Sequence, residues 1–155
     1  MLIVLLFAGF LIKAQDKSPE EVQKLIASQN YTFKAEQAFP QSGRSLVLTT
    51  DYDLKITIDS IISFLPYFGR SYTASLNPEE SGIKFTSTDF EYQNTKKKKS
   101  WEITIKPKDV SDIQEMSLSI FDNGTANLNV TSTNRQNISF RGYIKEGKGN
   151  KKKAF

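Results

Sequence analysis

The chain has 155 residues, the length of one ordinary domain, and it contains neither cysteine nor histidine. These absences exclude disulfides, thiol nucleophiles, the usual zinc ligands and the commonest proton shuttle, so we expect a protein that is not an enzyme and has no metal or cofactor. The net charge is +4. If Lys13, near the N-terminus, is left out, 20 basic residues remain, and eight of them lie in the stretches 96–99 and 148–153, so the rest of the chain has 12 basic against 17 acidic residues. We therefore interpret the two lysine-rich stretches as solvated segments and not as a nucleic-acid site.

Residues 2–12, LIVLLFAGFLI, form an apolar run with the length of a signal-peptide core, which is short for a bilayer span. We therefore predict a signal peptide over residues 1–14 and a periplasmic or secreted protein without a membrane span after cleavage. The alternative is an uncleaved anchor, because no lysine or arginine precedes the run.

Residues 18–21, Ser-Pro-Glu-Glu, have the pattern of a helix N-terminus. A serine N-cap, a proline at the first helical position and a glutamate three residues after the serine match a capping box. Val22, Leu25 and Ile26 then form a narrow apolar stripe, so the spacing predicts one amphipathic helix within residues 15–30 that lies on a sheet.

From Tyr31 onward the apolar residues recur at every second position, which is typical of half-buried strands. The segments 31–39, 46–48, 54–58 and 61–65 are separated by polar turns. The last of them leads into residues 65–72, Leu-Pro-Tyr-Phe-Gly-Arg-Ser-Tyr, which we call the corner segment.

The corner segment combines a fixed backbone angle at Pro66 with a free one at Gly69. We interpret it as a structural corner in which Gly69 has a conformation that only glycine adopts easily. Its aromatic side chains, Tyr67, Phe68 and Tyr72, are predicted to divide between the core and the rim of the fold.

Arg70 is the only charged residue of the corner segment and needs a partner if it is buried. We expect that partner to be Asp51, Asp53 or Asp59, or the ring of a neighbouring tyrosine. The alternative is a free guanidinium that binds the carboxylate or phosphate of a ligand.

The remaining chain continues as short alternating segments without a helical crossover. Asp122-Asn123-Gly124 predicts a hairpin with a type I′ turn, and Gly142 within a strand predicts a bend or a close backbone contact. The fold class is therefore mainly β: an antiparallel meander of eight or nine strands over residues 31–146 that curls into a small barrel or half-barrel, with one N-terminal helix and a disordered basic tail at 147–155.

Several motifs of this chain resemble the family catalogued as domain of unknown function 4251 (DUF4251), exported proteins of Bacteroidetes-type bacteria. They are LPYFGR at 65–70, GIKF at 82–85, Trp101, FDNG at 121–124 and RQNISF at 135–140. The resemblance implies a lipocalin-topology barrel and an envelope location. It brings no established activity, ligand or catalytic residue.

The function predicted from the sequence is a monomeric, non-catalytic envelope module that binds a small apolar or amphipathic ligand or a partner protein. The candidate ligand-binding residues are Tyr67, Phe68, Arg70, Tyr72 and Trp101. A first alternative is an interaction or structural factor whose barrel is filled by its own side chains, namely Phe33, Phe64, Phe85, Trp101 and Phe140. A second is a carboxylate-dependent glycan hydrolase, which needs two carboxylates facing each other across a groove.

Overall fold

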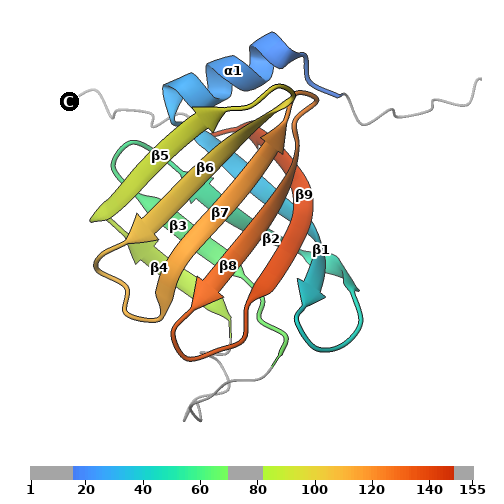
Figure 1. Ribbon diagram of the computed structural model, residues 1–155, viewed down its shortest axis with the longest axis vertical. Helices are drawn as coiled ribbons and strands as arrows, with labels where there is room; N and C mark the ends of the chain where they lie inside the picture. Colours follow the sequence, from blue (N-terminus) through green and yellow to red (C-terminus); the bar gives the residue numbers. More distant parts are fainter. Residues whose placement is uncertain (1–15, 70–81, 149–155) are drawn as a thin grey trace, which may run out of the picture.

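The structure is a computed structural model that describes residues 16–69 and 82–148. One helix is followed by nine strands, which form a single sheet in the order β4-β3-β2-β1-β9-β8-β7-β6-β5 (Figure 1). The elements are α1 (Pro19–Ser28), β1 (Tyr31–Pro40), β2 (Leu46–Ile56), β3 (Ile61–Leu65), β4 (Ile83–Ser87), β5 (Phe90–Lys96), β6 (Ser100–Pro107), β7 (Ile113–Phe121), β8 (Thr125–Ser132) and β9 (Ile138–Glu146).

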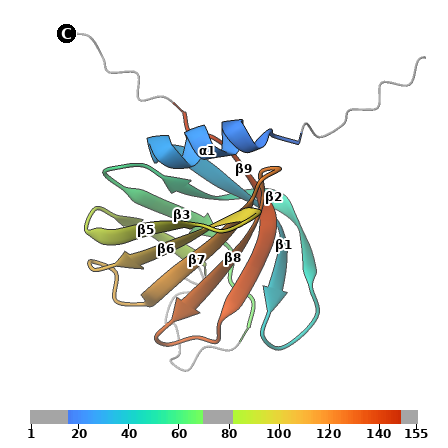
Figure 2. The ribbon, with the colours of Figure 1, turned by 45° about the horizontal axis from the view of Figure 1, so that its top comes forward.

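The sheet curls into a nearly closed barrel, which confirms the predicted fold class (Figures 1 and 2). From β4 round to β5 there are eight pairings, all of them antiparallel. Because eight is an even number, the two edge strands run in the same sense, and only Thr88 and Asp89 separate them in sequence. Together β4 and β5 therefore act as one strand bent at a corner, and this bend brings the two edges of the sheet together.

Asp109 holds the bend between β4 and β5. Its carboxylate accepts hydrogen bonds from the Ser87 hydroxyl and from the backbone N–H groups of Thr88 (3.0 Å) and Asp89 (3.3 Å). These donors favour the ionised carboxylate, and the pKa of Asp109 is lowered, first by the Ser87 hydroxyl and then by the Thr88 N–H.

We expect the stabilising contribution of Asp109 to depend on pH. Because its folded-state pKa is lowered, the contribution is present above the ordinary carboxyl pKa of about 3.9 and is lost as the pH falls through the lowered value. Thermal melts of the wild-type protein and the Asp109→Asn variant should differ most at neutral pH and converge in acid. Melting curves that stay equally far apart from pH 7 to pH 2 would contradict this account.

The helix α1 covers one end of the barrel, which we call the helix end (Figure 2). At its start, the Lys17 N–H donates to the Asn123 carbonyl (3.0 Å), and at its finish, Gln29 Nε2 donates to the Thr57 carbonyl (3.3 Å). The helix therefore spans the end from the β7–β8 hairpin to the β2–β3 hairpin and buries Val22 and Ile26 against the barrel. No helix among residues 16–69 and 82–148 is long and apolar enough to cross a membrane.

The predicted N-terminal helix signal is confirmed in detail. The Ser18 side chain accepts from the Glu21 N–H, the Glu21 side chain accepts from the Ser18 N–H, and Pro19 is the first helical residue. The hairpin at Asp122–Gly124 is also present, but the predicted type I′ turn is wrong. A type I′ turn needs a positive φ at both Asn123 and Gly124, but only Gly124 has one (88°). The Gly124 N–H donates to the Phe121 carbonyl at 2.9 Å, which is the geometry of a longer loop closed by a glycine bulge.

The barrel interior is filled by its own side chains. Strand residues alternate between buried and exposed positions, and the largest fully enclosed side chains include Tyr31, Phe33 and Phe140. A side chain without accessible surface lines no space wide enough for a water molecule, so the middle of the barrel is packed. The inward-facing residues with an exposed fraction of 0% include Phe33, Leu54, Ile56, Ile61, Leu65, Ile103, Ile105, Met116, Leu118, Ile120, Leu128, Val130 and Ile144.

Of the aromatic residues considered as fillers of the barrel, Phe64 is the one that does not point inward. Ile61, Ser63 and Leu65 are the buried positions of β3, so Phe64 faces outward, is 41% exposed and stacks on Tyr52 with ring centroids 5.6 Å apart. Phe85 and Trp101 are half-buried against the core. Of the five aromatic residues considered as fillers, only Phe33 and Phe140 are fully enclosed.

Candidate functional site

The corner segment begins at the end of the barrel opposite the helix. Tyr67 is half-buried there, and its hydroxyl donates to the backbone carbonyl of Gln136 at 3.0 Å. The guanidinium carbon of Arg135 lies 4.6 Å from the centroid of the Tyr67 ring, and Nη1 of Arg135 donates to the Gly82 carbonyl at 3.2 Å. One arginine thus joins the end of β3, the start of β4 and the β8–β9 turn.

The β1–β2 loop joins the same group through a side-chain hydrogen bond. The Ser42 hydroxyl donates to Oε1 of Gln136 at 3.1 Å. We call this group, made of Ser42, Tyr67, Phe68, Arg135 and Gln136, the rim. Three connections that are distant in sequence meet at the rim, so its shape depends on the closure of the whole barrel.

Gly69 has the conformation predicted for it. Its φ is 144°, a region that favours glycine, and a Cβ at this position would lie 3.0 Å from the Tyr67 hydroxyl oxygen. Phe68, one residue earlier, is 38% exposed. The corner segment therefore holds the Tyr67 ring against Arg135 and presents the Phe68 ring at the surface.

Arg70 and Tyr72 lie outside the described residues. The structure does show where the expected partners of Arg70 are. Asp51 and Asp53 both form ion pairs with Lys34, at an Nζ–Oδ2 distance of 3.5 Å for Asp53, while Asp59 lies in the β2–β3 turn at the helix end.

Lys34, Asp51 and Asp53 form a cluster of paired charged side chains, one lysine with two aspartates, on the outer face of β1 and β2. Burial opposes the charge of Lys34, but its hydrogen bond to Asp51 and the charge of Asp53 outweigh that penalty, and the pKa of Lys34 is raised. The hydrogen bond with Lys34 in turn lowers the pKa of Asp51. Lys34 and Asp51 are therefore ionised at neutral pH, and Asp51 is not arranged as the protonated acid of a hydrolase pair.

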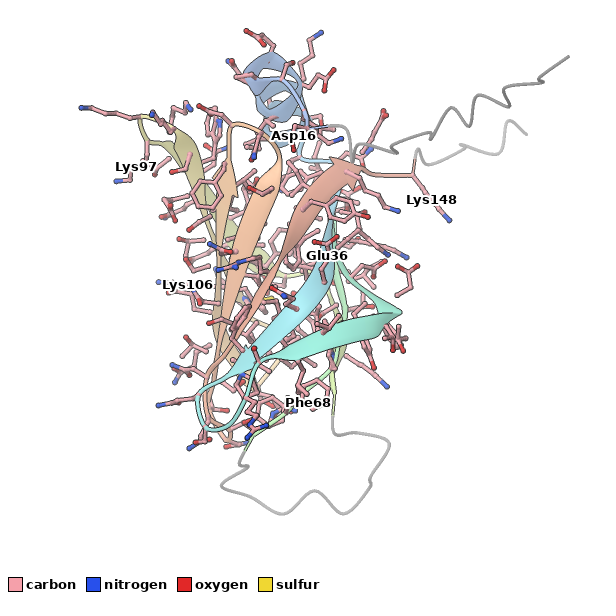
Figure 3. The ribbon with its side chains drawn as sticks, turned by 90° about the vertical axis from the view of Figure 1, so that its right-hand side faces the viewer. Asp16, Glu36, Phe68, Lys97, Lys106 and Lys148 are labelled. Atoms are coloured by element: carbon pink, nitrogen blue, oxygen red, sulfur yellow. The ribbon has the colours of Figure 1, made fainter. Side chains whose placement is uncertain are left out.

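Trp101 is at the helix end, remote from the rim. It pairs with Lys96 and Ile120 at the start of β6, and the Lys96 ammonium lies 5.4 Å from the centroid of its ring. Figure 3 supports this separation: Lys97, in the same hairpin as Trp101, lies toward the helix, whereas Phe68 of the rim lies at the opposite end. The structure thus brings Tyr67 and Phe68 together and places Trp101 apart from them.

A tyrosine pair that could not be predicted from the sequence crosses the barrel interior below the helix. The hydroxyls of Tyr31 in β1 and Tyr92 in β5 lie 2.9 Å apart. Burial raises the pKa of Tyr31 well above its usual range and also raises that of Tyr92, so both are neutral at physiological pH. They stabilise each other as polar groups in an apolar interior.

The roles of Arg135 and Gln136 were also missed, although both belong to a motif quoted for the family resemblance. The signal available in the sequence was that LPYFGR at 65–70 and RQNISF at 135–140 both carry the family resemblance, but nothing in the local spacing showed that the two motifs touch. Among residues 16–69 and 82–148, no group of three or more acidic side chains is placed to hold a metal ion.

Comparison with known proteins adds family and fold information. A family model described as "Domain of unknown function (DUF4251)" matches residues 13–144. A crystal structure of a DUF4251 family protein from Bacteroides eggerthii DSM 20697 is similar, with a TM-score of 0.56, 10% sequence identity, and coverage of 83% of this chain and 87% of that one. At this identity the structural likeness concerns the fold alone. No curated protein matches the chain.

Proposed function

The chain belongs to the DUF4251 family of domains of unknown function, and on that premise we propose that it is an exported, non-catalytic binding module that engages a partner protein through its rim. The packed interior carries this proposal. Because the central side chains have no accessible surface, a bound molecule would have to displace them, whereas Phe68 is already exposed at the rim.

The distribution of exposed apolar side chains supports a partner on this side of the barrel. Among the described residues, six of the eight large exposed apolar side chains lie between residues 46 and 68: five are in β2, β3 and the corner segment, and Ile58 is in the β2–β3 turn at the helix end. Apolar side chains concentrated in one part of a surface are typical of protein contacts, whereas single scattered ones are ordinary. The six are Leu46, Val47, Ile58, Ile62, Phe64 and Phe68.

The charged groups support a non-catalytic role. Asp51 and Asp53 both form ion pairs with Lys34, and the Asp109 carboxylate accepts three hydrogen bonds at the β4–β5 bend. The pKa values of Asp51 and Asp109 are lowered, so these two carboxylates have a low affinity for the proton that a general acid must donate.

A small apolar ligand is the second candidate. It is favoured by the half-buried aromatic side chains that border the core, including Phe85, Phe90, Tyr92 and Trp101. Such a ligand would occupy one end of the barrel and leave the middle packed. A native mass spectrum of protein purified from its own bacterium should detect it at equal stoichiometry with the chain.

Site-specific photocrosslinking tests the partner proposal. A photoreactive phenylalanine analogue at position 68 is compared with the same analogue at position 121, which is a matched control because Phe68 and Phe121 are each 38% exposed. In the native bacterium, position 68 should crosslink to one identifiable protein and position 121 should not. Equal crosslinking from both positions, or none from 68, would contradict the proposal.

The identified protein is then tested with purified components. Phe68→Ala should weaken binding by about 2 kcal/mol, which is about 30-fold in Kd, because exposed aromatic anchors dominate most interfaces. Phe121→Ala should leave the Kd unchanged.

A further inference from the structure

The β5–β6 hairpin carries a run of lysines to the helix end of the barrel. The Lys97 N–H donates to the Ser100 carbonyl at 2.8 Å, so Lys98 and Lys99 form the two-residue loop of the hairpin. The side chains of Lys97, Lys98 and Lys99 are all exposed. We call these three residues the lysine tip.

The lysine tip differs from Lys96, which precedes it. Lys96 forms an ion pair with Asp122 at 2.9 Å and lies over the Trp101 ring. Within the part of the chain that the structure describes, no carboxylate lies within 4 Å of the three amines of the tip, as the five ion pairs found there involve other lysines. The tip therefore presents three positive charges without a counter-charge.

Acidic residues also occur at the helix end, at the start of α1. They are Asp16, Glu20 and Glu21, and the Glu21 carboxylate is held in the capping box by the Ser18 N–H. In Figure 3, the Lys97 side chain extends away from the helix and from Asp16. The acids of α1 consequently leave the charge of the tip directed outward.

The backbone of the loop does not require lysine. Two-residue hairpin loops favour glycine, asparagine or aspartate because these residues adopt positive φ readily. Neither Lys98 nor Lys99 has a positive φ, and lysine is not one of the residues that favour turns. Three adjacent like charges also repel one another, so the composition of the tip is explained by an external anion better than by the turn.

Both ends of the described chain lie toward the same end of the barrel as the tip. Figure 3 shows Asp16, Lys97 and Lys148 toward the helix and Phe68 at the opposite end. In sequence, the apolar run 2–12 precedes Asp16, and Lys151, Lys152 and Lys153 follow Lys148. Apolar residues and lysines that adjoin in sequence the two chain ends, Asp16 and Lys148, at this end of the barrel favour a membrane surface over a nucleic acid, whose single strands would also need stacking rings.

We propose that the helix end of the barrel binds peripherally to an anionic phospholipid bilayer, with Lys97, Lys98 and Lys99 contacting the headgroups. This orientation leaves the rim facing away from the membrane. The inference goes beyond the proposed partner binding and does not depend on it, because the lysine tip and Phe68 are at opposite ends. The attraction is electrostatic and therefore decreases with ionic strength.

Vesicle co-sedimentation of the full chain tests this inference. Binding is measured on vesicles of 30 mol% phosphatidylglycerol in phosphatidylcholine and on vesicles of phosphatidylcholine alone, and the ratio of the two partition coefficients isolates the charge-dependent part from any contribution of the apolar run. Each lysine near an anionic surface contributes about fivefold, so K97Q/K98Q/K99Q should lower this ratio by about 100-fold at low salt.

The matched control is K84Q/K106Q/K108Q, which removes the same charge from exposed lysines away from the helix end. It should retain the wild-type ratio within about twofold, and 0.5 M NaCl should reduce the wild-type ratio toward one. Equal losses in both triple variants would show that only net charge matters and would overturn the assigned surface. A wild-type ratio near one at low salt would overturn membrane binding altogether, and photocrosslinking from position 68 would still test the partner proposal separately.

Discussion

Replacement of Gly142 by alanine should prevent stable folding of the domain. Gly142 in β9 pairs with Ala35 in β1, beside an irregularity in the register of both β1 pairings. A Cβ at position 142 would overlap the carbonyl oxygen of Lys34 and lie 2.8 Å from its carbonyl carbon. Because the obstructing atoms are backbone, no side-chain rotation can relieve the overlap.

The expected loss exceeds about 4 kcal/mol, which is a large part of the roughly 5–15 kcal/mol that stabilises a typical domain. Urea denaturation monitored by circular dichroism should show a lower midpoint or no cooperative transition. Gly43→Ala is the control, since Gly43 has a positive φ (112°) but no atom within 4 Å of its Cβ position. A Gly142→Ala midpoint close to that of Gly43→Ala would contradict the steric account.

Replacement of Gly69 by valine should cost more than about 2 kcal/mol of unfolding free energy. Two effects add at this position. The φ of 144° is unfavourable for a β-branched residue, and the new Cβ would press on the Tyr67 hydroxyl, which donates to the Gln136 carbonyl. The rim should therefore loosen as the domain is destabilised.

Two variants separate these effects in the same denaturation experiment. Gly43→Val has a positive φ and open space, so it reports the backbone strain alone. Tyr67→Phe keeps the ring beside Arg135 and removes only the hydroxyl donor, at an expected cost of about 1 kcal/mol. If Gly69→Val is no more destabilising than Gly43→Val, then contact with Tyr67 contributes nothing.

Local features of this fold could be predicted because their physical causes are local. The capping box of α1 needs only residues 18–21, and the period-two alternation of apolar residues follows from the pleat of a strand. Gly142 stood out because glycine within an apolar strand indicates a close backbone approach, which the structure contains. The hairpin at Asp122–Gly124 was located correctly, but its turn type depends on one extra residue in the loop.

The faces of short apolar runs could not be assigned from the sequence alone. Apolar residues occupy both alternating sets of positions in the segment 61–65, so either Ile61 and Leu65 or Ile62 and Phe64 could face the core. The pairing of β3 with β2 and β4 decides the matter and leaves Phe64 on the outside. In the same way, the bend that makes β4 and β5 one strand depends on Asp109, which lies beyond both strands in sequence.

The sequence by itself determined the class of the fold, the helix cap and the special status of Gly69 and Gly142, because a backbone conformation or a repeat period acts over a few residues. Only the tertiary structure decided which distant residues meet. Tyr67 and Gln136 are 69 residues apart and Tyr31 and Tyr92 are 61 apart, yet barrel closure brings each pair into hydrogen-bonding distance. Closure also sends Trp101 to the helix end and Phe68 to the rim, since alternation specifies a face of the sheet but not an end of the barrel.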